Sequence, residues 1–482
     1  MFDARPVGYV IGLLVAVLGV SMLIPTAFDY AQGDPNWWAF AESALMTIFV
    51  GGTVALSCAN TAGQKLSIQQ TFLITTGVWF ALPIFGALPF VLGAPEARYV
   101  DAFFEAMSGL TTTGSTVFSG LDAMPQGFLL WRGILQWLGG IGIIVVAMVF
   151  LPELRVGGMQ IFRTEAFDTF GKILPRAGEI ASRISGIYLS LTAVCAICYY
   201  LAGLSPFDAT VHAMTTIATG GFANYDASFA AFDPAAEYVG TAFMMLAALP
   251  FVRFVQLTAG TARPLLEDRQ IHVFFATALV IVCLLASQTV IRDGSFTEPA
   301  IRKALFNAVS IMTGTGYASA DYMTWGSFAV AMMFFIGLIG GCAGSTSCSI
   351  KIFRYQLLFS SIRTQLQRIR SPHGVFIPRF AGRAVAPDVL NSVMSFFVFF
   401  IVTLGLVAVG LAMTGLDFTT SISGAAAALG NIGPGLGDVI GPTGNFAPLN
   451  DTAKWLLAFA MLVGRLEVMA VYAILTVRFW RA

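Results

Sequence analysis

The stretch S-G-L-T-T-T-G-S-T at residues 108–116 decides how the rest of the chain is interpreted. It is rich in glycine and hydroxyl groups, yet it lies between a short apolar segment, 102–107, and a membrane-length one, 128–151. Irregular backbone at membrane depth is tolerated only where it is buried in protein or lines water. Glycine lets carbonyl oxygens turn inward and threonine adds a hydroxyl oxygen, and together these can replace the water shell of a cation. The stretch is therefore a candidate ion filter, although a single loop of this kind is more often a surface turn.

Similar loops recur roughly 100 residues apart, which favours a pore over chance turns. The three further loops are I-A-T-G-G-F at 217–222, M-T-G-T-G-Y at 312–317 and L-G-N-I-G-P-G at 429–435. The glycines taken as equivalent are Gly114, Gly220, Gly316 and Gly433. Each interval holds two membrane-length apolar runs and one short one. This order predicts an all-α polytopic membrane protein with four pore-loop repeats in fourfold pseudo-symmetry.

The composition excludes a water-soluble globular protein. Of 482 residues, 57% are hydrophobic and 11% are charged, whereas ordinary domains carry roughly a quarter charged residues. The six cysteines lie in or beside apolar segments, so disulfides are not expected. The three histidines have no second ligand at helical spacing, so no bound metal centre or cofactor is expected. The chain has no G-x-x-x-x-G-K-[ST] loop, which argues against an ATP-driven pump, and we do not expect an enzyme.

Ten apolar runs are long enough to span a bilayer. They are 7–24, 37–58, 68–92, 128–151, 184–201, 238–257, 272–291, 325–353, 389–413 and 454–479. The first two form an N-terminal part at 1–64, and the repeats are predicted at 65–155, 156–262, 263–370 and 371–482. Each repeat has a short re-entrant helix before its loop. Helix caps are expected at Asp101, 206–208, 297–299 and 417–419.

An even number of spans places both termini on one side of the membrane. Most of the 26 Lys and Arg residues then share that side, which identifies it as the cytoplasm. Most of the 26 acids fall on the other side, which we interpret as a mouth that concentrates cations.

The predicted span 325–353 contains an expected break. Residues 337–351 read G-L-I-G-G-C-A-G-S-T-S-C-S-I-K, and glycine costs about 1 kcal/mol per helix position relative to alanine. Serine and threonine offer competing hydrogen bonds to the backbone. Small residues also serve helix packing, but they then recur at every fourth position. An unwound segment directly below the filter loops can act as a gate.

Arg465 is a costly residue within the predicted span 454–479. A charge at mid-helix costs roughly 2.5 to 3.5 kcal/mol on insertion scales. Glu467 faces another side of a continuous helix and is not an obvious partner. The cytoplasmic end of the span lies too far away for the side chain to reach it. Arg465 is therefore predicted to face the water-filled path.

A run of basic residues follows the expected break. Between Lys351 and Arg383 there is no acid, and the arginines are Arg354, Arg363, Arg368, Arg370 and Arg379. Lipid headgroups are one expected ligand of such a surface. An acidic cytoplasmic partner is the other.

Taken together, these motifs resemble the superfamily of K⁺ transporters that includes the Trk, Ktr and plant HKT proteins, and most closely its bacterial TrkH/TrkG type. The resemblance rests on 108–116, Q-W-L-G-G-I-G-I-I-V at 136–145, G-G-C-A-G-S-T at 340–346, N-I-G-P-G-L-G at 431–437 and G-R-L-E at 464–467. It implies potassium uptake across the bacterial inner membrane through a K⁺-selective pore with an intramembrane gating loop. It also implies a homodimer and a cytoplasmic TrkA-type subunit that binds the regulatory nucleotide. Nucleic acid is not an expected partner. H⁺- or Na⁺-coupled potassium symport remains the alternative.

The resemblance also assigns residues. The implied K⁺ filter consists of Thr112, Thr113, Gly114, Ala218, Thr219, Gly220, Gly314, Thr315, Gly316, Asn431, Ile432 and Gly433. The implied gate consists of Gly340, Gly341, Cys342, Ala343, Gly344, Ser345, Thr346, Ser347, Cys348, Ser349 and Arg465. The gating loop departs from the glycine-rich family pattern at 347–349. The two additional N-terminal helices favour the TrkH type over shorter Ktr subunits.

Overall fold

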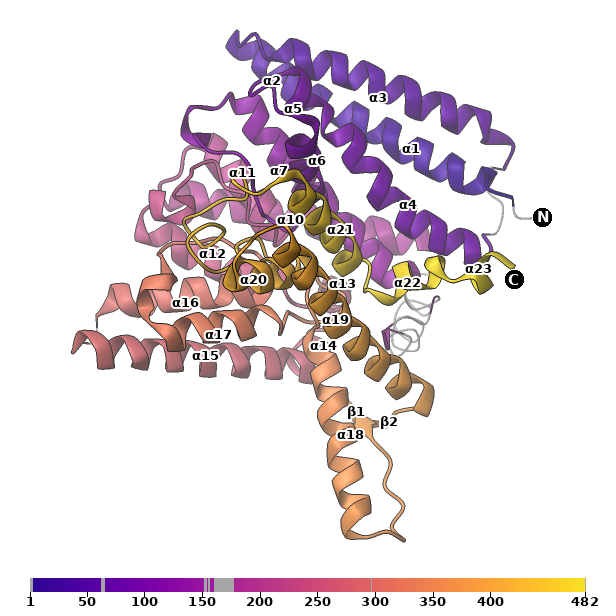
Figure 1. The fold of residues 1–482 in the computed structure, drawn as a ribbon, viewed down its shortest axis with the longest axis vertical. Coiled ribbons are helices and arrows are strands. Elements are labelled where there is room, and N and C mark those ends of the chain that lie inside the picture. The colour runs from indigo at the N-terminus through magenta and orange to yellow at the C-terminus, as the bar shows by residue number, and fades with distance from the viewer. Residues whose placement is uncertain are drawn as a thin grey trace.

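The computed structural model describes residues 3–61, 66–150, 154, 157–159, 177–295 and 297–481. Within these ranges the chain is helical apart from irregular loops and one hairpin, in which β1 (Arg379–Phe380) pairs antiparallel with β2 (Arg383–Ala384). Helix α18 (Ile352–Arg370) and this hairpin project from the body as an arm (Figure 1). The all-α class is therefore confirmed. The predicted boundaries at 64/65 and 155/156 fall outside the described residues.

The N-terminal part forms the two expected spans. Helix α1 (Arg5–Ser21) leads through Met22 into α2 (Leu23–Gln32), and α3 (Trp37–Ser57) packs along α1. The two backbones come close at Gly12 and Gly51, because a Cβ atom on Gly12 would lie 2.8 Å from the Gly51 carbonyl oxygen. Small residues allow this close packing of helices in a membrane.

The remaining helices follow the expected order of span, short helix, loop and span. The first repeat contains α4 (Ile68–Gly86), α5 (Leu88–Leu92), α6 (Tyr99–Leu110) and α7 (Gln126–Val145), extended by a π-helical turn (Val146–Phe150). The second contains α10 (Ala177–Leu201), α11 (Pro206–Ile217), α12 (Pro234–Ala247), α13 (Phe251–Thr258) and α14 (Arg263–Leu266). The third contains α15 (Arg269–Asp293), α16 (Glu298–Thr313), α17 (Ser327–Gly337) and α18. The fourth contains α19 (Pro387–Met413), α20 (Phe418–Gly430), α21 (Asp451–Arg465), α22 (Met469–Leu475) and α23 (Val477–Arg481). Single 3₁₀ turns lie at Ala59–Thr61, Leu121–Ala123, Ser228–Ala231 and Tyr322–Trp325.

Continuous membrane spans are fewer than the sequence suggested. In the described part of the chain, seven helical segments are long and apolar enough to cross a membrane. Two more qualify only as bent pairs, α12 with α13 and α21 with α22. The prediction of an unbroken span is therefore wrong at 238–257 and 454–479. The expected break in 325–353 is confirmed, because α17 ends at Gly337 and α18 begins at Ile352.

Each bend coincides with a backbone feature through which a helix does not continue. The 88° bend between α12 and α13 contains Pro250, which has no amide hydrogen for a helical bond. The 108° bend after α21 places Glu467 at φ 61° and Val468 at φ 52°. This left-handed region is unfavourable for residues with a side chain, so a helix does not continue through it.

The expected caps are only partly present. Asp417 caps α20, because its carboxylate accepts a hydrogen bond from the Thr420 amide. Ser205, one residue before the predicted 206–208, caps α11 through the Asp208 amide. Thr297 occupies the cap position of α16, but its side chain accepts no capping hydrogen bond.

The cap predicted at Asp101 is wrong. Helix α6 begins at Tyr99, so Asp101 already lies in its first turn. Its carboxylate instead pairs with Arg98 at 3.0 Å and with the Lys454 ammonium at 2.6 Å. The sequence could not indicate the second contact, because Lys454 belongs to α21.

The two ends of the chain lie at the same end of α4. The side chain of Gln70 donates to the Asp3 carbonyl oxygen at 2.9 Å, and that of Gln69 donates to the Phe479 carbonyl oxygen at 2.6 Å. Figure 1 shows the two termini near each other at one edge of the molecule.

Candidate ion path and gate

Each short helix ends in a loop with the same backbone pattern. One amide in each loop donates to the carbonyl oxygen five residues earlier. The four bonds are Thr113 to Ser108 (2.8 Å), Gly220 to Thr215 (2.8 Å), Thr315 to Ser310 (2.9 Å) and Ile432 to Ala427 (3.0 Å). On either side of that amide lies a residue with positive φ, and the pairs are Thr112 with Gly114, Thr219 with Gly221, Gly314 with Gly316, and Asn431 with Gly433.

This pattern corrects the register of the second loop by one residue. The glycine equivalent to Gly114 is Gly221, with φ 80°, whereas Gly220 is equivalent to Thr113. Ala218, predicted to belong to the filter, is the C-terminal cap of α11 and corresponds to Thr111. The sequence could not decide between two adjacent glycines, because the choice depends on where α11 ends.

The four loops meet in a closed ring. A Cβ atom on Gly114 would overlap the Gly220 carbonyl oxygen, and one on Gly221 would overlap that of Thr315. A Cβ atom on Gly316 would likewise overlap the Ile432 carbonyl oxygen. One on Gly433 would lie 2.9 Å from the Thr113 carbonyl oxygen. Each loop therefore touches the next in the order first, second, third, fourth and first again. The backbone carbonyls 113, 220, 315 and 432 are thereby brought together from segments far apart in the sequence.

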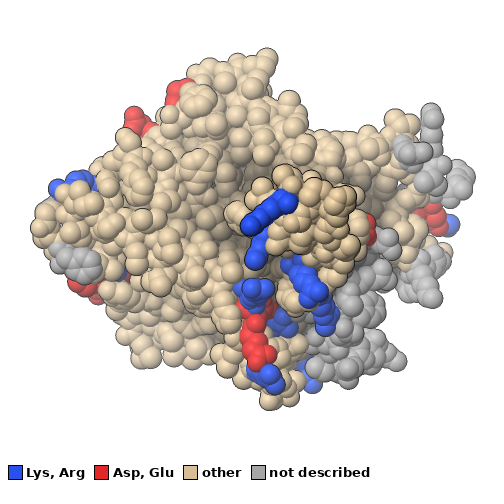
Figure 2. Space-filling view, turned by 90° about the horizontal axis from the view of Figure 1, so that it is seen from below, with Lys and Arg blue, Asp and Glu red and all other residues tan. Residues whose placement is uncertain are grey.

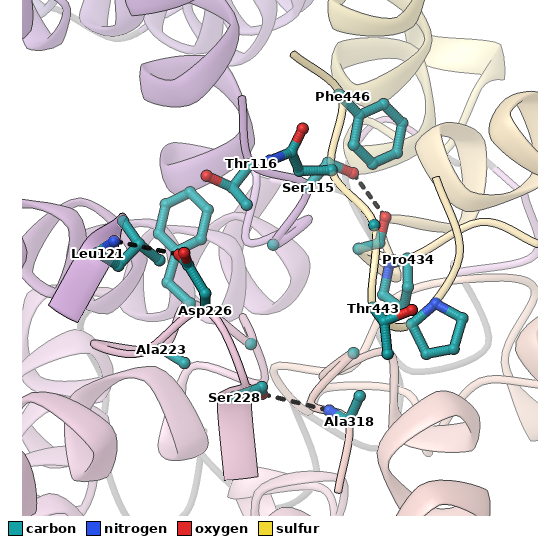
Figure 3. A pocket seen from close by; sticks show the side chains of 18 of the residues that line it. Ser115, Thr116, Leu121, Ala223, Asp226, Ser228, Ala318, Pro434, Thr443 and Phe446 are labelled. Atoms are coloured by element: carbon teal, nitrogen blue, oxygen red, sulfur yellow. Dashed lines mark hydrogen bonds between the residues drawn. The ribbon is translucent and has the colours of Figure 1, made fainter. Parts of the chain in front are cut away.

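A cavity of about 320 Å³ opens on this ring, and one positive-φ glycine of each loop lines it, namely Gly114, Gly221, Gly316 and Gly433. Labelled residues from every repeat surround it in Figure 3. Ser115 donates across to the Gly433 carbonyl oxygen at 2.7 Å, which joins the first loop to the fourth. Asp226 accepts hydrogen bonds from the Gly120 and Leu121 amides at 2.7 and 3.1 Å, which joins the second loop to the first.

Two of the acids expected at an outer mouth are instead buried in ion pairs with arginines. Glu105 pairs with Arg132 at 2.8 Å, with both side chains buried. Glu237 is likewise buried against Arg302. Among the described residues that line the cavity, Asp226 is the acid. Counting charges in the sequence therefore overestimates the negative field at the mouth.

The segment predicted as a gate lies unwound against the filter loops. Its Ser347 hydroxyl donates to the Thr313 carbonyl oxygen at 2.6 Å, at the start of the third loop. A Cβ atom on Gly314 would be 3.7 Å from the Cys348 amide. The residues predicted for the loop, 340–349, are buried or half-buried as one segment.

The bend between α12 and α13 holds this segment from the other side. The Cys342 amide donates to the Ala248 carbonyl oxygen at 3.0 Å, and the Phe251 amide donates to that of Gly344 at 2.9 Å. The helix end exposed by Pro250 therefore binds the backbone of the gating loop. This contact explains why the predicted span 238–257 is broken.

Arg465 joins the loop to the first repeat. Its side chain is 2% exposed. One terminal nitrogen donates to the Gly139 carbonyl oxygen at 3.1 Å. The other donates to the Thr346 carbonyl oxygen at 3.4 Å and contacts the Cys348 sulfur. Its Nε has no hydrogen-bond partner. Arg465 is also the last residue of α21, where the negative end of the helix dipole favours a cation.

Glu467 does not pair with Arg465, as expected, but the reason differs from the prediction. The helix has already ended, and Glu467 turns to the Lys351 ammonium at 2.8 Å and to the Arg354 guanidinium. All three side chains are buried. Lys351 and Arg354 therefore do not belong to an exposed basic surface, which corrects that part of the prediction. The triad connects the end of the gating loop and the start of α18 to the bend after α21.

Sequence reasoning also missed Gln136 as a contact residue of the loops. Its amide nitrogen donates to the Gly220 carbonyl oxygen at 2.6 Å, and its amide oxygen accepts from the Phe222 amide at 3.0 Å. It is fully buried in α7. An amide side chain in an apolar span was the available signal, because a buried polar group must find a partner.

Comparisons with known proteins agree with this architecture. The family model TrkH, described as a cation transport protein, matches residues 38–479. The Trk system potassium uptake protein TrkI of Halomonas elongata is 43% identical over 478 residues, which covers 99% of this chain and 97% of the relative. The corresponding protein TrkH of Vibrio parahaemolyticus is 36% identical over 491 residues, with 99% of each chain covered. The crystal structure of the potassium transporter TrkH from Vibrio parahaemolyticus covers 100% of both chains, with a TM-score of 0.90 at 34% identity.

Proposed function

This chain belongs to the TrkH family of cation transport proteins, and we propose that it takes up potassium through the ring of four loops. The family membership and the apolar helices make it a multi-pass membrane protein. The family is one of transporters, and we assign no enzymatic activity to the chain. The observation that carries the proposal is the closed ring, in which each loop brings a backbone carbonyl against the next.

The proposed filter uses backbone oxygens in place of the water around K⁺. Its residues are Thr112, Thr113, Gly114, Thr219, Gly220, Gly221, Gly314, Thr315, Gly316, Asn431, Ile432 and Gly433. This set differs from the sequence prediction in that Gly221 replaces Ala218. Positive φ at two positions per loop supports the assignment, because alternating backbone conformations can point successive carbonyls to one side.

The proposed gate is the loop 340–349 together with Arg465. The loop contacts the third filter loop, and Arg465 ties the loop to Gly139. A guanidinium near a narrow path also repels a cation, by about 4 kcal/mol at 4 Å with an effective dielectric of about 20. Steric closure and repulsion would act together.

Transport measurements in proteoliposomes test this function. With opposed gradients of K⁺, Na⁺ and pH, we expect the reversal potential to follow the K⁺ gradient alone, since a selective pore couples to no second ion. A reversal potential that also moves with the Na⁺ or H⁺ gradient would favour coupled symport instead. Absence of K⁺ flux from well-folded protein would contradict potassium uptake altogether.

We further propose that the chain works in the cytoplasmic membrane, with both termini inside, as a homodimer that binds a cytoplasmic nucleotide-binding subunit of the TrkA type. Its relatives are named as proteins of a Trk system, which indicates several components. Figure 2 views the molecule from the side of the arm and shows Lys and Arg side chains on and around it. The exposed basic residues of the arm are Arg363, Arg368, Arg370, Arg379 and Arg383. Helix α18 also exposes an apolar stripe, namely Phe359, Ile362, Leu366 and Ile369, which a second copy or lipid would cover.

Reversing one charge on the arm is expected to weaken the soluble subunit's binding. We expect Arg370→Glu to reduce the amount of the cytoplasmic subunit that co-purifies from native membranes by about two- to fivefold, as for one exposed ion pair. Arg5→Glu, an equal charge change at an exposed residue that begins α1, a helix that lies away from the arm in Figure 1, serves as the control. Equal co-purification with both variants, at low and high salt, would contradict a docking role for the arm.

A further inference from the structure

Beyond the ring, each filter loop is held once more by a side chain of its own short helix. The amide four residues after the ring carbonyl donates to that side chain in every repeat. The four bonds are Val117 to Glu105 Oε2 (3.0 Å), Asn224 to His212 Nε2 (3.4 Å), Ser319 to Asn307 Oδ1 (3.2 Å) and Leu436 to Ser423 Oγ (2.9 Å). Three of the acceptors occupy the same position eight residues before the ring carbonyl, and Ser423 lies one residue earlier.

We propose that Glu105, His212, Asn307 and Ser423, here called the four struts, are positioning residues that set the width of the filter and hence its ion selectivity. The inference rests on the proposed function of the ring. The struts touch no ion themselves. They act by fixing the backbone that carries the ring carbonyls.

Four different residue types make the same bond, which argues that the position matters more than the side chain. A carboxylate, an imidazole, an amide and a hydroxyl share only the ability to accept a hydrogen bond. All four are buried, with exposures between 0 and 3%. Buried amides need a partner, but any residue could satisfy them. Here the partner is always the helix that ends in the ring, so each loop is closed on its own helix.

Each strut is itself held in place by a further contact. Arg132 donates to Glu105 at 2.8 Å and, through another nitrogen, to the Ala223 carbonyl oxygen at 2.7 Å. The first strut is thereby linked to the second filter loop. Asn307 donates to the Ser319 hydroxyl at 3.0 Å and to the Lys303 carbonyl oxygen at 2.8 Å.

The other two struts are held in comparable ways. His212 Nδ1 lies 2.9 Å from the Asp208 carbonyl oxygen, so the hydrogen belongs on Nδ1 and Nε2 is left as the acceptor. Ser423 accepts from the Leu436 amide and donates to the Leu436 carbonyl oxygen at 3.2 Å. Every strut is therefore oriented before an ion arrives.

The hydrogen bonds of the struts matter for selectivity because a site discriminates between similar ions only while its carbonyl ligands stay at fixed positions. Functional groups generally have to be held within about 0.5 Å by surrounding hydrogen bonds and packing. A loop released from its strut can let its carbonyls close around the smaller Na⁺. Loss of a strut should therefore admit Na⁺ rather than only reduce the amount of folded protein.

Ser423 offers the cleanest test. We expect Ser423→Ala to raise the permeability of Na⁺ relative to K⁺ about two- to tenfold, the range set by one hydrogen bond lost from a buried group. Ser423→Thr keeps the hydroxyl and should restore the wild-type ratio. Ser421→Ala is the matched control, because Ser421 is also buried in α20 but its hydroxyl donates to the Leu416 carbonyl oxygen at 3.4 Å and, within the described residues, not to the filter loop. Asn307→Leu, which has a similar shape without an acceptor, tests a second repeat in the same way.

The measured quantity is the permeability of Na⁺ relative to K⁺ in proteoliposomes. This ratio does not depend on the amount of protein. Wild-type protein without K⁺ flux would overturn the proposed function itself. If wild type conducts K⁺ selectively, and Ser423→Ala and Asn307→Leu conduct with the wild-type ratio, the struts do not set selectivity. A raised Na⁺ ratio in both variants, with Ser421→Ala and Ser423→Thr unchanged, would support them.

Discussion

Replacing Gly221 with alanine is expected to lower K⁺ uptake about tenfold or more and to weaken rejection of Na⁺, whereas Gly220→Ala should have the smaller effect of the two. Gly221 has φ 80°, and a Cβ atom there would overlap the Thr315 carbonyl oxygen, which is itself part of the ring. A left-handed conformation alone costs a residue with a side chain roughly 1–2 kcal/mol. The backbone overlap adds to that cost, because a carbonyl in the ring cannot move aside without changing the filter.

In the matched variant, Gly220→Ala, the added Cβ atom meets a side chain and not the backbone. A Cβ atom there would overlap the amide end of the Gln136 side chain, which must then shift together with its hydrogen bond to the Gly220 carbonyl oxygen, but no backbone atom is overlapped and the φ of Gly220 is not positive. The equivalent position in the first loop already carries a side chain, that of Thr113. Gly114→Ser, at the position equivalent to Gly221, should behave like Gly221→Ala.

Uptake of K⁺, Rb⁺ and Na⁺ by each variant, normalised to the amount of protein in the membrane, measures both effects. If Gly220→Ala proves more damaging than Gly221→Ala, the register read from the sequence is right and the one read from the structure is wrong. Equal and small effects of both would contradict the filter assignment of the second loop.

Replacing Arg465 with alanine is expected to raise K⁺ flux severalfold in the absence of any regulatory subunit, without changing the K⁺/Na⁺ ratio. The change removes a buried positive charge and the contacts that tie Thr346 to Gly139. Repulsion of a cation by about 4 kcal/mol, at 4 Å and an effective dielectric of about 20, is large compared with the 1.4 kcal/mol that changes a rate tenfold. Selectivity should persist because no filter hydrogen bond involves Arg465.

Two further variants separate the effect of the Arg465 charge from steric closure by the loop. Arg465→Lys keeps the charge but cannot bind two carbonyl oxygens in the same way, so flux near the wild-type level would assign the effect to charge. Shortening the loop 340–349 should raise flux more strongly, and combining it with Arg465→Ala should give less than the product of the two effects. If Arg465→Ala abolishes flux in well-folded protein, Arg465 orders the pore and this gating scheme is wrong.

The sequence predicted the helical class and most spans well, because apolar length is a local property. The run 389–413 is an example, and α19 (Pro387–Met413) agrees closely. The break in 325–353 was also predictable, because a dense run of glycine, serine and threonine does not form a stable helix. The bends in 238–257 and 454–479 were missed. Their apolar composition fits a span, and each bend leaves groups that are satisfied only by distant parts of the chain.

The sequence by itself determined that the chain crosses a membrane and that four glycine-rich loops follow four short helices. It also determined that the charge of Arg465 is energetically costly within an apolar span. These conclusions need only composition, spacing and the cost of a charge in lipid. The tertiary structure alone decided that Gly221 belongs to the ring, that Glu467 binds Lys351 and Arg354, and that the struts hold the loops. Lys351 lies in the third repeat and Glu467 in the fourth, and a pair so far apart leaves no local pattern. Such contacts arise only when folding brings distant buried polar groups together, because each must find a partner once water is excluded.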